Sequence, residues 1–115
     1  MSEKIAKEYL RHVLEEVKFV LARVENLNEE SFVKDEVLKR AIVRSLEIVG
    51  EAIKNLPDDY RNKHSEIDWK SLAGLRDKLI HHYFGVDYGI VWDVAVKELP
   101  ELKEKLEKIL VEDQI

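Results

Sequence analysis

Hydrophobic residues recur every three or four positions along most of the chain, which is the spacing of amphipathic helices. The first such segment covers residues 3–26, with Ser2 at the N-cap position before it. Its apolar stripe is Ile5, Tyr9, Val13, Val17, Val20 and Val24. A polar break, NLNEES, precedes a second helical segment that begins at Ser31 or Asp35 and ends at Leu56, just before a proline. Both segments are predicted to be helices with one buried face.

In the middle of the chain, the sequence pattern predicts a short helix and then a longer one. The short helix covers residues 58–63. The longer helix runs over residues 69–84, because Asp68 is a suitable N-cap and Gly85 a suitable end.

Two more helices are predicted near the C-terminus, over residues 88–97 after the N-cap Asp87 and over residues 101–111. Pro100 occupies a natural first-turn position for the last helix. No segment shows the alternation of a strand. The pattern therefore predicts an all-α fold, an antiparallel bundle of four main helices plus short helices, forming a single domain over residues 1–115.

Composition narrows the class of protein further. Of the 115 residues, 45% are hydrophobic and 37% are charged, as expected for a folded helical domain. The absence of cysteine excludes disulfides, thiolate metal sites and thiol catalysis. The N-terminus has no apolar signal region, and no apolar run approaches membrane-spanning length, so we expect a cytoplasmic protein without a membrane partner.

The charge is unevenly distributed along the chain. The net charge of −5 is unfavourable for general binding to nucleic acid. Residues 60–83, however, hold five Lys or Arg against three acidic residues, and three of the four histidines. A site for a polyanion is therefore expected in that part of the chain.

Arg76 stands out because an ideal helix counted from Trp69 places it within the apolar stripe. A guanidinium cannot lose its charge, so it needs a carboxylate, a phosphate or access to water. One alternative is a structural ion pair with Glu47 or Glu51. His81 lies about 140° from Arg76 on the same ideal helix, so the two side chains would not share a face.

Metal binding is a weaker alternative. Asp77 and His81 are four residues apart, as are Glu8 and His12, and either pair could chelate a divalent ion. The Glu-x-x-His pairs of di-iron bundles and the His-Glu-x-x-His motif are both absent. Phosphate-binding glycine loops are absent too. We therefore expect neither a metal nor another cofactor.

The string Arg76-x4-His81-x-Tyr83 resembles the signature of HEPN-domain proteins, in the subgroup of HepT-like toxins. Residues 44–52, RSLEIVGEA, resemble the second-helix segment of that family. Its downstream pattern is matched by Trp69, Gly74, Leu75, Arg76, Tyr83, Phe84, Gly85, Val86, Asp87 and Trp92. The chain departs from the family at Ser45 and at Asp77, where asparagine is usual or common.

The resemblance implies a metal-independent RNA endonuclease that works as a homodimer, with the motifs of both subunits in one cleft. His81 would move a proton to or from the RNA, and Arg76 would hold the phosphate. Asp77 would orient one of these two side chains. Arg44 and Glu51 would support the site structurally, by joining the second helix to the motif helix.

The resemblance also implies a toxin–antitoxin system in which the partner is an MntA-like nucleotidyltransferase. This antitoxin would transfer AMP to Tyr83 and so block the cleft. On a continuous helix, Tyr83 would lie about 10 Å along the axis from Arg76, on the same bearing.

Two other functions fit the same residues. The first alternative is a non-catalytic helical module that binds a nucleotide or a partner nucleotidyltransferase. A purely structural helical dimer would explain the apolar stripes but not Arg76. A neighbouring nucleotidyltransferase gene would exclude the structural dimer, and RNA cleavage in EDTA would separate the remaining two functions.

Overall fold

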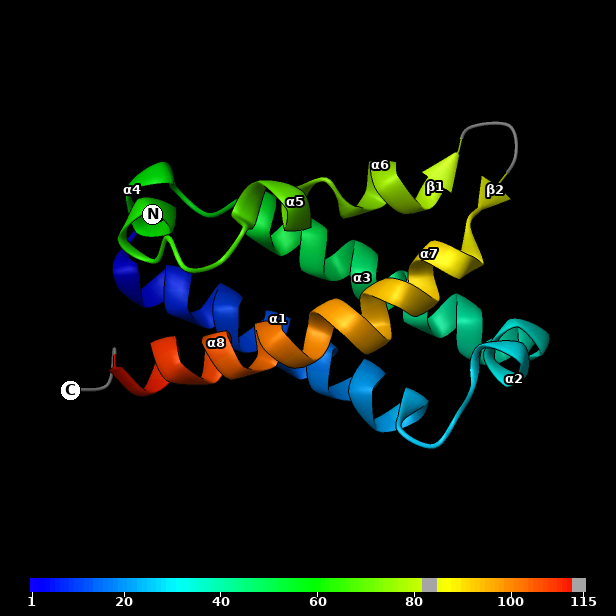
Figure 1. The fold of residues 1–115 in the computed structure, drawn as a ribbon. Coiled ribbons are helices and arrows are strands. Elements are labelled where there is room, and N and C mark those ends of the chain that lie inside the picture. The colour runs from blue at the N-terminus through cyan, green and yellow to red at the C-terminus, as the bar shows by residue number, and fades with distance from the viewer. Residues whose placement is uncertain (82–84, 113–115) are drawn as a thin grey trace.

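The computed structural model describes residues 1–81 and 85–112, and the side chain of His81 lies outside the described part. Helices make up most of the described chain (Figure 1), as the sequence predicted. Helix α1 is Glu3–Val24, and the Ser2 hydroxyl accepts a hydrogen bond of 3.2 Å from the Ile5 amide. Its buried stripe differs from the predicted one at the start, where Ala6 and Leu10 are fully buried and Ile5 is 48% exposed.

The second predicted segment is two helices. Helix α2 is Glu29–Lys34, which includes much of the stretch predicted as a polar break, and α3 is Glu36–Lys54. The break is present but shorter than predicted: it ends at Asn28, which caps α2 by accepting a bond of 2.8 Å from the Ser31 amide. Asp35 caps α3 in the same way, which decides between the two predicted starting points. Helix α4, Asp58–Lys63, has its predicted bounds.

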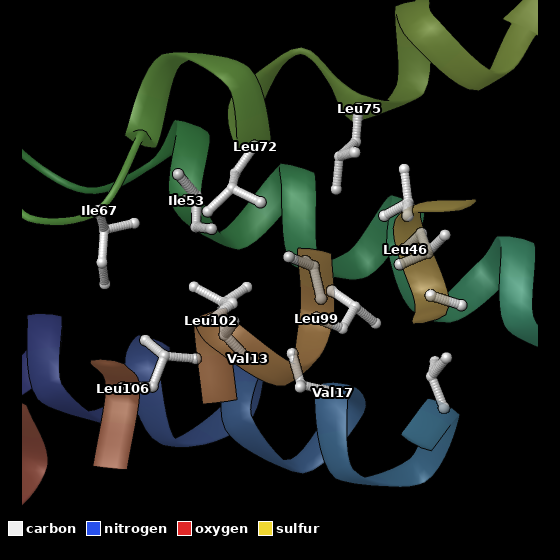
Figure 2. Close-up of a cluster of buried hydrophobic side chains, with 14 of the residues drawn as sticks. Val13, Val17, Leu46, Ile53, Ile67, Leu72, Leu75, Leu99, Leu102 and Leu106 are labelled. Carbon is white, nitrogen blue, oxygen red and sulfur yellow. The ribbon is translucent and has the colours of Figure 1, made fainter. Parts of the chain in front are cut away.

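The predicted long helix over residues 69–84 is wrong. Helix α5, Trp69–Ala73, is capped by Asp68, and the chain is interrupted at Gly74 before α6, Leu75–Leu79. Glycine favours such an interruption because it loses more conformational freedom in a helix than any other residue. Leu72, before the interruption, and Leu75, after it, both point into the core (Figure 2).

A small hairpin follows α6, although no strand was predicted. The backbone turns extended at Ile80, and β1, Ile80–His81, pairs antiparallel with β2, Gly85–Val86. The Asp87 amide donates to the Leu79 carbonyl at 2.9 Å, and Gly85 has a φ of +77°, which favours glycine. The helical-wheel position expected for His81 therefore does not apply, and Tyr83 lies outside the described residues.

The C-terminal part is a continuous helical path from α7 to α8 (Figure 1). Helix α7 is Tyr88–Asp93, capped by Asp87 as predicted, and α8 is Leu99–Glu112. The π-helical turn η1, Val94–Glu98, occupies the end of the predicted helix 88–97. The predicted gap at residues 98–100 is absent, because α8 already begins at Leu99, and Pro100 lies in its first turn as expected. Proline has no amide hydrogen and its ring crowds the preceding turn, which a wide π turn accommodates.

The core lies between α1, α3, α5–α6 and α8 (Figure 2). Side chains from all four parts meet there, and the labelled ones are Val13, Val17, Leu46, Ile53, Ile67, Leu72, Leu75, Leu99, Leu102 and Leu106. In Figure 1, α3 lies between α1 on one side and α5–α6 on the other. This arrangement is the antiparallel all-α bundle predicted from the sequence.

Phe32 attaches α2 to α7. Its fully buried ring lies 5.4 Å from that of Trp92 and 6.5 Å from that of Tyr88, measured between ring centroids. Lys39 reinforces this corner, because its ammonium lies 4.5 Å from the Tyr88 ring centroid and donates to the Val33 carbonyl at 3.0 Å.

We predict that Phe32→Ala lowers the free energy of unfolding by about 3–5 kcal/mol, because it leaves a cavity among buried aromatic rings. Val111 is 61% exposed near the end of α8, so the control Val111→Ala should change the free energy of unfolding by less than about 0.5 kcal/mol. Urea denaturation followed by circular dichroism measures both. Equal effects for the two variants would contradict this account of the α2–α7 corner.

Candidate functional site

A groove of about 610 Å³ lies over the face of α3 that points away from the core. Helix α3 forms its floor, α1 contributes one wall, and α5–α6 contribute the other. The groove is lined by Tyr9, His12, Arg44, Glu47, Ile48, Gly50, Glu51, Ala52, Lys54, Asn55, Ala73, Arg76 and Asp77. It brings together four of the five residues predicted to form or support the site: Arg44, Glu51, Arg76 and Asp77.

Arg76 is exposed at the rim of this groove. Leu75 and Leu79, on the same short helix, are buried and hold α6 against the core. The predicted alternative of an ion pair with Glu47 or Glu51 is not formed, and no other carboxylate within residues 1–81 and 85–112 pairs with this guanidinium. Arg76 is therefore available to bind an anion.

Asp77 is exposed on the same wall. No hydrogen bond or ion pair joins it to Arg76, so an orienting role toward Arg76 is not seen here. Its expected role toward His81 concerns a side chain outside the described part and stays a prediction.

Arg44 and Glu51 are exposed on the floor of the groove. No hydrogen bond or ion pair joins either side chain to α5 or α6, and their expected structural role remains a prediction. The close contact between these helices is made by Gly50 instead. A Cβ atom there would lie 3.2 Å from the Leu72 carbonyl oxygen, which is tighter than almost all real contacts.

The backbone of His81 is held at the end of α6 by the hairpin. It pairs with Gly85, while the neighbouring pair is Ile80 with Val86. Arg76 and His81 therefore belong to different elements, a helix and a strand, so the angle between them on an ideal helix no longer describes their relation.

The wall formed by α1 was not predicted. Tyr9 and His12 line this wall of the groove, although they are far from Arg76 in the sequence. Their spacing of three residues places them on one face of α1, but nothing local to α1 indicates which distant helix that face meets. The sequence suggested a role for His12 only as a metal ligand together with Glu8. In the structure, Glu8 pairs with Arg11 instead.

The described residues contain no group of three or more His, Asp or Glu side chains that could hold a metal ion. Within the same residues, no helix is both long and apolar enough to cross a membrane.

Comparison with known proteins identifies the family. The family model described as "Ribonuclease HepT-like" matches residues 7–109. A protein of Caldanaerobacter subterraneus subsp. tengcongensis named "Putative RNase" is 53% identical over 111 residues, which are 96% of this chain and 99% of the relative. The "Probable ribonuclease HepT" of Thermococcus cleftensis is 41% identical over 103 residues, covering 90% of this chain and 94% of the relative.

No solved structure matches the chain. The family model and the relatives nevertheless cover nearly the whole sequence, including the Arg76–Tyr83 motif and the groove-lining residues of α1, α3, α5 and α6. The chain therefore belongs to the HepT-like ribonuclease family of HEPN proteins.

Proposed function

We propose that this protein is a metal-independent RNA endonuclease whose active site lies at the Arg76 end of the groove. The observation that carries the proposal is an exposed arginine with no carboxylate partner among the described residues, on the wall of a groove, five residues before His81. The relatives named as RNases support the general activity.

RNA supplies its own nucleophile, so the protein needs only proton transfer and charge stabilisation. The 2′-oxygen attacks the phosphorus and loses its proton, and the bond to the 5′-oxygen breaks as that oxygen gains a proton. The products are a 2′,3′-cyclic phosphate and a 5′-hydroxyl. Arg76 stabilises the charge on the phosphate oxygens, and His81 exchanges protons near neutral pH.

A homodimer would supply the second histidine. One chain has one His81, whereas the reaction uses both a base and an acid. The outward face of α3 beside Arg44 has apolar side chains, with Val37 81% exposed and Ile48 partly exposed. A two-fold contact near this face would cover them and bring two grooves together.

Control by a partner completes the proposal. An MntA-like nucleotidyltransferase antitoxin would transfer AMP from ATP to the Tyr83 oxygen, releasing pyrophosphate. The added phosphate would then compete with RNA for the cationic site. The family resemblance of the motif, not the described structure, supports this part.

We predict that the protein cleaves RNA in excess EDTA, and that Arg76→Ala and His81→Ala each lower kcat about 100-fold or more. Lys97→Ala is the matched control, since Lys97 is exposed on η1 and pairs only with Asp93 at 3.4 Å. Gel analysis of a labelled RNA measures the rates. Cleavage that EDTA abolishes, or that both substitutions leave intact, would refute this mechanism.

We predict a dimer at micromolar concentration. Sedimentation equilibrium should give twice the mass of the chain. Val37→Asp, outside the groove lining, should shift the equilibrium toward monomer and lower cleavage, because a charge would be buried at the contact. A wild-type protein that sediments as a monomer would remove the shared cleft from the mechanism.

We predict that the cognate nucleotidyltransferase with ATP adds about 329 Da per AMP to this protein and silences cleavage. Tyr83→Phe should keep the fold and escape the added mass. Intact-mass spectra of the two proteins incubated together decide the outcome. A mass shift that persists in Tyr83→Phe would place the modification elsewhere, and no shift would favour the non-catalytic binding module.

A further inference from the structure

The α1 wall of the groove presents a histidine that the proposed chemistry does not use. The His12 side chain is 56% exposed and lines the groove opposite Arg76. Its neighbours along one face of α1, Leu10 and Val13, are fully buried, so the backbone that presents His12 is anchored in the core. A ligand in the groove would therefore meet this imidazole at a fixed position.

The imidazole is only weakly paired. Its Nε2 atom lies 3.8 Å from a carboxylate oxygen of Glu16, which makes an ion pair when the imidazole is protonated but is longer than a hydrogen bond. Glu8, one turn earlier on α1, is occupied by Arg11.

The fixed charges of the groove lining balance. The basic side chains are Arg44, Lys54 and Arg76, and the acidic ones are Glu47, Glu51 and Asp77. Among the lining side chains that the structure describes, His12 is the one imidazole, the group that changes its charge most readily near neutral pH. A protonated imidazole at this position would add a positive charge to that part of the lining.

We propose that His12 is a further RNA-binding residue of this site. In its protonated form it donates a hydrogen bond to a phosphate oxygen of the single strand that Arg76 holds, so that the strand lies across α3 between the two walls. RNA binds more tightly at lower pH, because the charged form of the imidazole is the one that binds. This inference rests on the proposed function, since it takes RNA as the ligand.

The test is equilibrium binding of a fluorescein-labelled single-stranded RNA to the full-length His81→Ala protein. That background prevents cleavage and removes the titration of His81. We expect binding about three- to tenfold tighter near pH 6 than near pH 8, the range that one typical, solvent-exposed hydrogen bond contributes. The slope of log K against log salt should be steeper near pH 6 by about 0.7, the value for one phosphate contact with a single strand.

Two substitutions at His12 separate its charge from its shape. With His12→Gln added, binding should stay weak at both pH values, and with His12→Arg it should stay tight at both. His82→Gln, at the other motif histidine, is the matched control and should keep the pH dependence. A pH dependence unchanged in His12→Gln, or no RNA binding at either pH, would overturn the inference.

The outcome is independent of the cleavage assay. A protein that cuts RNA in EDTA but binds it identically with and without His12 would retain the proposed function and lose this inference. A protein that binds RNA with a His12-dependent pH profile but never cuts it would retain this inference and lose the proposed function.

Discussion

The close approach of α5 to Gly50 is the contact on which the arrangement of the site depends. A side chain at position 50 would meet the Leu72 carbonyl oxygen at 3.2 Å, so a larger residue would push α5–α6 away from α3. Glycine inside a helix costs roughly 0.5–1 kcal/mol relative to alanine. Helix α3 tolerates that cost because Leu46, Val49 and Ile53 are buried along its inner face. The close approach of α5 to α3 places α6 at the edge of the groove, with Arg76 facing it.

The parts of the fold that depend on local chemistry could be predicted from the sequence. Ser2, Asp35, Asp68 and Asp87 each accept a hydrogen bond from an amide three residues later, which fixes where α1, α3, α5 and α7 begin. A short polar side chain before an apolar periodic segment needs no tertiary contact to act this way. For these four helices, the helical conformation and the starting residue could therefore be predicted from the sequence.

The breaks could not be predicted in the same way, because periodicity assumes that a helix continues. Leu72, Leu75 and Leu79 keep a helical spacing across Gly74, so the pattern gives no sign that the helix is interrupted there. Strands of two residues are too short to show alternation, and the bond from the Asp87 amide to the Leu79 carbonyl is visible only once the chain has turned. The predicted helical position of His81 failed for this reason, while that of Tyr83 concerns a residue outside the described part of the chain.

Only the Arg76 side of the groove could be predicted from the sequence. The wall formed by α1 could not, because it too depends on tertiary packing. The motif singled out Arg76 from one segment, but which face of α1 lies opposite depends on how α1 packs against α3, and no local pattern encodes that. The net charge of −5 was equally uninformative about binding, because it sums residues over the whole surface. Exposed charges more than about 10 Å apart are largely screened at 0.1 M salt. A phosphate in the groove therefore responds mainly to the side chains that line it. Among the described lining residues three are basic and three are acidic, so the negative net charge of the whole protein need not prevent a phosphate from binding there.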